Sequence, residues 1–146
     1  MKAKLLDATG QKTFALVFDK GEEAIAGLTR FAATERLGAA HFTAIGAFSE
    51  ATLGYFEPSR RSYKRMPLSE QVEVLSLIGD VALDAAGEPK VHAHVVVGCA
   101  DGSTRGGHLL AGRVWPTLEV ILVESPSHLR KRHDPESGLA LIDPAA

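Results

Sequence analysis

The sequence predicts an α+β domain, in which a mostly antiparallel β-sheet carries one main helix. Only residues 22–37 show the periodicity of an amphipathic helix. After them come about seven segments rich in branched and aromatic residues, joined by turns too short for the crossover helices of a parallel sheet. The length of 146 residues, 45% of them hydrophobic and 23% charged, suits one globular domain with its own core.

The helix is predicted from its apolar stripe and from its two ends. Glu22 and Glu23 are expected in the first turn, where negative charge is favoured by the positive end of the helix dipole. Gly38 is expected just after the last turn, where a left-handed residue commonly ends a helix. The stripe consists of Ile25, Leu28, Phe31 and Ala32.

The strands are predicted from apolar alternation and from the turn residues between them. Thr9–Gln11 is expected to form a turn around Gly10. Gly79 indicates a bulge or bend within a long strand, and Pro116 is expected just outside the last strand. The predicted strands are residues 4–7, 13–19, 41–48, 51–56, 63–66, 71–83, 91–99, 105–114 and 118–124.

Residues 125–144 differ in composition, because they mix proline, glycine and charged residues. We expect residues 1–126 to form the domain. Residues 127–146 are expected to form a C-terminal tail that packs on the domain or on a neighbouring subunit.

Charge and cysteine content exclude several classes of protein. Lys and Arg together number 16 against 18 Asp and Glu, and this net charge of −2 argues against a broad electrostatic grip on nucleic acid. Cys99 is the single cysteine, so no disulfide can form within the chain. The N-terminus lacks the apolar core of a signal peptide, and no apolar run approaches the ~20 residues of a membrane span. We therefore expect a cytoplasmic protein.

Three histidines form the most informative pattern in the sequence. His92 and His94 share one face of the strand 91–99 because side chains alternate with period two. A turn at 101–103 returns the chain, which brings His108 almost opposite residue 95 or 96 and within a residue or two of His94. Three converging imidazoles are the ligand set of an open, catalytic zinc site. The alternative is a set of ordinary polar residues on a solvated sheet face.

The other residues of interest are weaker candidates. Glu73 on the strand 71–83 is a candidate acid/base or a partner of a ligand histidine, and Arg105 is a candidate for binding a substrate carboxylate. An exposed sheet carboxylate and a surface turn cation are the alternatives for these two residues. Cys99 is out of phase with the histidine pair, so it is not expected to bind metal. His41, His128 and His133 are expected to be surface or structural residues.

Several segments of the sequence carry a family resemblance. They are residues 44–48 (AIGAF), 52–56 (TLGYF), 71–79 (QVEVLSLIG), 106–109 (GGHL) and 119–121 (EVI), together with His92. From about Leu16 to Glu124 the chain resembles the plant and prokaryote conserved (PPC) domain. This resemblance implies a compact α+β fold assembled as a homotrimer, with His92, His94 and His108 retained as in bacterial members. The fold is also similar to that of acetolactate decarboxylase, which holds zinc with an H-x-H pair and a third histidine.

Three functions are compatible with these observations. The first is a small trimeric protein that binds a divalent metal, zinc above all, and acts as a hydrolase or lyase on a small oxygenated substrate. The second is a DNA-binding or regulatory protein, which the family and the basic residues at 60–65 and 130–132 favour, although the chain has no Arg-Gly-Arg-Pro hook. The third is a trimeric protein-interaction module.

Overall fold

The computed structural model describes residues 1–7 and 10–145. Thr9, in the predicted first turn, lies outside the described residues. The elements in chain order are β1 (Lys2–Asp7), β2 (Thr13–Phe18), α1 (Ala24–Thr34), β3 (Ala39–Glu57), β4 (Ser62–Leu68), β5 (Val72–Leu83), β6 (Pro89–Gly98), β7 (Thr104–Glu124), β8 (Arg130–His133) and β9 (Ala140–Asp143).

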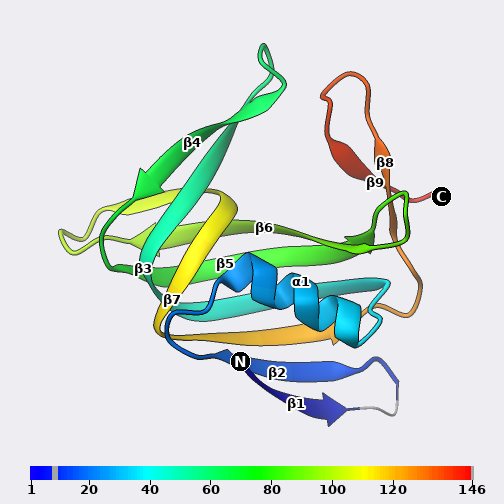
Figure 1. Cartoon of the computed structure of the whole chain (residues 1–146), viewed down its shortest axis with the longest axis horizontal. Coiled ribbons are helices and arrows are strands. Elements are labelled where there is room, and N and C mark those ends of the chain that lie inside the picture. The colour runs from blue at the N-terminus through cyan, green and yellow to red at the C-terminus, as the bar shows by residue number, and fades with distance from the viewer. Residues whose placement is uncertain (8–9, 146) are drawn as a thin grey trace.

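The strands form one sheet with α1 packed across one face, which confirms the predicted mostly antiparallel architecture (Figure 1). The main path of the sheet runs β1-β2-β7-β3-β5-β8-β9, with β4 paired to β3. Strand β6 pairs with both β5 and β7, and β7 and β5 each pair with β3. These four strands therefore form a closed circuit of backbone hydrogen bonding. No helix among the described residues is long and apolar enough to cross a membrane.

The core lies between α1 and the sheet. Strand β6 contributes Ala93, Val95 and Val97 to it, and its alternate residues face the other side of the sheet. Burial of these valines therefore fixes the direction in which His92 and His94 point. The largest fully buried side chains include Phe18, Phe42, Phe48, Leu28, Leu118 and Leu122.

Helix α1 is shorter than predicted at both ends. Glu23 is the N-cap, and its carboxylate accepts hydrogen bonds from the backbone N–H groups of Ile25 and Ala26. At the other end, Arg36 takes the left-handed conformation, with φ of 55°, that was expected of Gly38. Leu37 N then bonds Ala32 O, and Arg36 N bonds Ala33 O, as in a Schellman motif. The prediction that Gly38 ends the helix was wrong, because the non-glycine residue Arg36 adopts the left-handed conformation two residues earlier.

Two pairs of predicted strands are in fact single long strands. Segments 41–48 and 51–56 merge into β3, and 105–114 and 118–124 merge into β7. Gly46 pairs with Leu118 and Phe48 with Val114, so residues 115–117 lie opposite one residue of β3. This bulge holds Pro116 inside β7, because a bulged residue need not donate to the ladder. Pro116 therefore interrupts the register without ending the strand.

The bulge predicted at Gly79 lies elsewhere on β5. The register shifts between Val74 and Ser76, whereas Gly79 pairs regularly with Ala93. A Cβ at Gly79 would run into the Phe42 ring and the His92 carbonyl oxygen. The glycine is therefore required for close approach of neighbouring strands rather than for a bulge.

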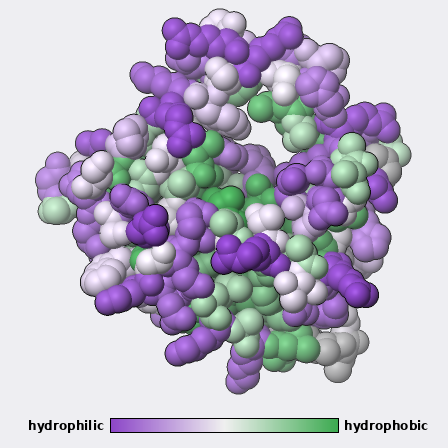
Figure 2. All heavy atoms as spheres, in the orientation of Figure 1, coloured by the Kyte–Doolittle hydropathy of each residue, from purple (hydrophilic) through white to green (hydrophobic). Residues whose placement is uncertain are grey.

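Two β-hairpins project from the sheet as arms (Figure 1). One is formed by the end of β3 and β4, and the other is the C-terminal hairpin β8–β9, whose first residue Arg130 pairs in parallel with Leu83 of β5. Figure 2 shows a hollow between these arms with hydrophobic side chains on its walls. The boundary at residue 126 stays a prediction, but the hairpin beyond it packs on its own chain.

Candidate metal centre

His92, His94 and His108 converge on one point of the sheet surface. Each offers a ring nitrogen, and these atoms all lie within 4.8 Å of one another. The ring centroids are 5.1 Å apart for His92 and His94, 5.1 Å for His92 and His108, and 5.5 Å for His94 and His108. The structure thus brings together the three residues that sequence spacing singled out.

Strand register explains this convergence. His94 pairs directly with His108, rather than residue 95 or 96 as predicted. The pairing of β6 with β7 is regular from His94 to Gly98, with no register shift at Gly106 or Gly107. Gly107 instead lets β3 approach, because a Cβ there would lie 2.8 Å from the carbonyl oxygen of Gly54.

Asp80 is the carboxylate next to the cluster. It pairs with His92 across β5 and β6, and its Oδ2 lies 3.4 Å from His92 Nδ1. Lys131 of β8 reaches the same carboxylate, with its Nζ 3.5 Å from Oδ1, and only 8% of the Lys131 side chain is exposed. This arrangement orients the His92 ring and leaves its Nε2 for another ligand.

Electrostatics favour neutral rings at His94 and His108 and an ionised Asp80. Burial, reinforced by the charges of His92, His94 and Lys131, lowers the pKa of His108 to about 4. Burial and the neighbouring His92 also lower the pKa of His94. Burial by itself raises the pKa of Asp80, but the hydrogen bond from His92 and the charge of Lys131 hold that pKa below its ordinary value. Neutral imidazole is the form that binds metal.

His108 is held by an aromatic neighbour. Its ring stacks on Tyr63 of β4, with centroids 4.6 Å apart and planes 20° apart. Its Nδ1 is buried and has no hydrogen-bond partner among the described residues. A buried ring nitrogen without a partner is costly in an apo protein, and a bound ligand would remove that cost.

The cluster opens into a pocket between the two arms, with a volume of about 520 Å³. This lies within the ~300–1,000 Å³ typical of small-molecule sites. The sheet contributes the three histidines, and the C-terminal hairpin contributes apolar residues. The lining residues are Tyr63, Lys90, Val91, His92, His94, His108, Lys131, Leu139, Ala140, Leu141 and Ile142.

The two weaker candidates lie outside this pocket. Glu73 is exposed on β5 and pairs with Gly98, at the far end of β6 from His92. Arg105 is exposed and pairs with Val97. Asp80 was missed, although a β5–β6 turn centred on residue 86 places residue 80 opposite residue 92. Lys131 could not have been found from spacing, because the tail's position is set by tertiary packing.

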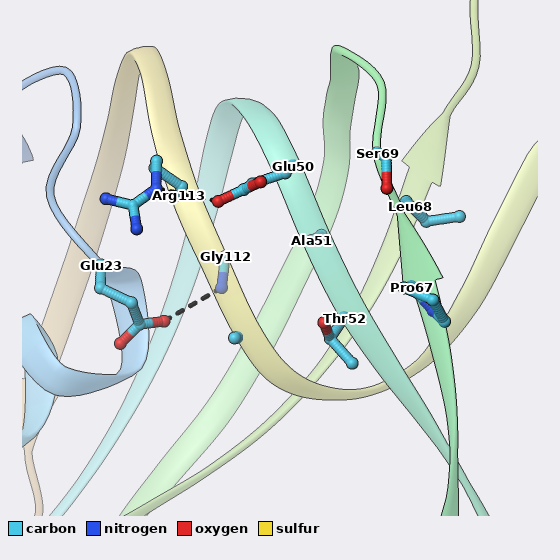
Figure 3. Close-up of a pocket in the computed structure, with 10 residues that line it drawn as sticks. Glu23, Glu50, Ala51, Thr52, Pro67, Leu68, Ser69, Gly112 and Arg113 are labelled. Carbon is cyan, nitrogen blue, oxygen red and sulfur yellow. Dashed lines mark hydrogen bonds and ion pairs between the residues drawn. The ribbon is translucent and has the colours of Figure 1, made fainter.

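A second pocket, lined by Glu23, Glu50 and Arg113 among others, is occupied by structural interactions (Figure 3). The Glu23 carboxylate accepts a hydrogen bond from Gly112 N at 3.0 Å in addition to capping α1. Arg113 donates to Glu50 and to the carbonyl oxygen of Gly21. Its charged side chains therefore hold α1 against β7, and its volume of about 220 Å³ is below that of typical ligand sites.

Fold and cluster together define a class of protein: a small antiparallel β-domain with one covering helix and three histidines at an open pocket. The family model for the Plants and Prokaryotes Conserved (PCC) domain matches residues 6–126. The chain therefore belongs to this family, also called PPC, as its sequence motifs indicated.

Solved structures share this fold. A PPC protein from Pyrococcus horikoshii is 32% identical, with a TM-score of 0.85 over 94% of this chain and 97% of that one. A metal-containing protein from Archaeoglobus fulgidus is 32% identical, with a TM-score of 0.84 over 95% and 98%. A proposed DNA-binding protein from Ralstonia eutropha JMP134 is 28% identical, with a TM-score of 0.83 over 89% and 90%.

More distant matches limit what can be transferred. A Staphylococcus aureus protein similar to α-acetolactate decarboxylase shares the fold at 11% identity, with a TM-score of 0.55 over 84% of this chain and 53% of that one. The bifunctional protein GlmU of Synechococcus sp. (strain JA-2-3B'a(2-13)) is 33% identical over 130 residues. The match covers 87% of this chain, but the chain spans only 19% of the length of that relative.

Proposed function

We propose that the protein holds one divalent metal ion, zinc above all, on His92, His94 and His108, and that this centre serves hydrolase or lyase chemistry on a small oxygenated substrate. The observation that carries the proposal is the convergence of three ring nitrogens within 4.8 Å, on two paired strands beside a half-buried carboxylate. A metal-containing relative of the same fold from Archaeoglobus fulgidus supports it.

The residues present fit such an ion. Tetrahedral zinc with bonds of about 2.0–2.1 Å needs ligand nitrogens roughly 3.3 Å apart, which modest rotation of the imidazoles would achieve. The lowered pKa values of His94 and His108 keep two rings in the ligand form at neutral pH. Asp80 beside His92 is the carboxylate–histidine pair that commonly supports a metal ligand.

Three protein ligands would leave room at the ion for water or a substrate oxygen. A bound zinc would supply Lewis-acid chemistry there and would lower the pKa of bound water to near 7. The chain's own residues supply the rest: Asp80 and Lys131 fix the His92 ring, and Tyr63 fixes that of His108.

Metal analysis of protein purified without an affinity tag tests this proposal. We expect about one zinc ion per chain in the wild type, and a loss of most of it in H92A and in H108A. His41→Ala is the matched control, because His41 is an exposed histidine of β3 that lies outside the cluster. Equally low metal in the wild type and in H92A, after incubation with zinc, would end the proposal.

We also propose self-association, as the family resemblance to homotrimers led us to expect. The sheet exposes large aliphatic side chains along a hollow on its surface, which is unusual for a monomer. Ile45 is 61% exposed and Ile78 55% exposed. The hollow also contains Val17, Leu75 and Ile121. Light scattering coupled to gel filtration should give a trimer for the wild type and a smaller species for I45D.

Nucleic-acid binding is the second candidate function, and the exposed basic end of the β3–β4 arm favours it. The exposed basic residues there are Arg60, Arg61, Lys64 and Arg65. Among the described residues, Arg60 is the one of these four that forms an ion pair, with the carboxylate of Glu57. The Ralstonia eutropha relative proposed to bind DNA shares the fold. Specific binding would survive competitor DNA at physiological salt, whereas retention that vanishes with added salt indicates nonspecific adhesion.

A further inference from the structure

The C-terminal hairpin forms one wall of the histidine pocket, although it lies beyond residue 126, where the family match ends. Register determines which of its residues face the histidines. Lys131 pairs with Ile142, so their side chains share one face of the hairpin. Because the Lys131 side chain reaches Asp80 beside His92, this face points at the cluster. Ile142 therefore faces the site.

The opposite face of the hairpin carries its other charged side chains. Arg132 pairs with Leu141, and Arg132 Nε lies 3.1 Å from Asp143 Oδ2 on that same face, although Leu141 also lines the pocket. The Arg132 side chain is 71% exposed, in contrast to the nearly buried side chain of Lys131. The hairpin thus turns charged groups to solvent, and toward the pocket it presents Lys131, which is paired with Asp80, and aliphatic side chains.

The pocket consequently has a polar end and an apolar end. Three imidazoles lie at the sheet, whereas Leu139, Leu141 and Ile142 of the C-terminal hairpin line the other side. The two lysines of the lining are already neutralised, because Lys131 pairs with Asp80 and Lys90 with Asp84. Excess positive charge in the pocket would then come from the metal ion of the proposed function, held by the three imidazoles.

We propose that the ligand is a small monocarboxylic acid with a compact branched apolar body, and that Ile142 selects it. This inference rests on the proposed metal centre, which would attract the single negative charge of a carboxylate. The apolar body lies against Ile142 and Leu139, where aliphatic contacts stabilise it and offer no hydrogen bond to a polar ligand. Ile142 acts on specificity through contact with the ligand body.

Calorimetric titration of zinc-loaded, full-length protein with acetate and with 3-methylbutanoate tests the proposal. The wild type should bind 3-methylbutanoate about tenfold more tightly than acetate, since each buried methylene contributes up to about fourfold. Ile142→Ala should reduce this preference about threefold while leaving acetate binding unchanged. Val96→Ala is the matched control, because Val96 shares the His94 face of β6 but lies outside the pocket lining.

Zinc content, measured on the same samples, separates the two proposals. A zinc-loaded wild type without preference for 3-methylbutanoate, or one that binds inorganic phosphate more tightly than either acid, would overturn the carboxylate inference alone. An unchanged preference in Ile142→Ala, or an equal loss in Val96→Ala, would overturn the role of Ile142. A wild type that takes up no zinc would overturn the metal centre and the inference together.

Discussion

Substitution of Asp80 by Asn should weaken metal binding while preserving the fold. The Asp80 carboxylate lies 3.4 Å from His92 Nδ1 and is paired with the nearly buried side chain of Lys131. Removing its charge makes His92 a weaker base and leaves the Lys131 ammonium without its counterion. Loss of such a supporting carboxylate typically costs 10–100-fold in metal affinity, or about 1.4–2.8 kcal/mol. We expect D80N to fall within this range.

Competition against a chromophoric zinc chelator measures this loss directly. Glu73→Gln is the matched control, because Glu73 is an exposed carboxylate on the same strand, β5, that pairs with Gly98 at the far end of β6. The control should retain wild-type affinity. If D80N binds zinc within about twofold of the wild type, or if E73Q loses as much, Asp80 does not support His92 as the geometry indicates.

Three further outcomes follow from the contacts described. Metal-free protein should lose stability as pH falls from 6.5 toward 4, because the unfolded chain protonates His108 and His94 while their lowered pKa values oppose protonation in the folded form. H108F should show a smaller loss of stability between urea titrations at pH 7 and at pH 5. Glu23→Ala removes the helix cap and the bond to Gly112 N, so urea unfolding should show a loss of about 1–3 kcal/mol, unlike the exposed-site variant E73Q. Gly79→Ala places a methyl group against the His92 carbonyl oxygen. The free energy of unfolding should therefore fall by about 1–3 kcal/mol, and zinc affinity should fall with it. Unchanged zinc affinity would show that the strands adjust without moving His92.

The architecture was accessible from the sequence because local patterns determine it. Alternation on residues 91–99 places His92 and His94 opposite the buried valines, and the short turn before Arg105 returns His108 to them. Element ends were less predictable. The left-handed residue that ends α1 is Arg36 rather than a glycine, and Pro116 is absorbed by a bulge instead of ending a strand.

The surroundings of the cluster depend on long-range packing that no local pattern encodes. Asp80 meets His92 only because β5 and β6 pair in one register, and a shift of one residue would turn it to the other face. Lys131 lies in a segment whose composition suggested a surface tail, yet its side chain is nearly buried beside Asp80. Sequence spacing thus indicates candidate ligands more readily than the residues that orient them.

The closed circuit of β3, β5, β6 and β7 has a consequence for the kinetics of the site. Strand β6 is paired along both edges near His94, so its amides exchange with solvent only when a large part of the sheet opens. The C-terminal hairpin is attached through the single β5 pair Leu83–Arg130, a few adjoining backbone bonds and the Lys131–Asp80 ion pair. The histidines therefore lie on a slowly exchanging platform, whereas the Ile142 side of the pocket belongs to a segment held by far fewer backbone hydrogen bonds.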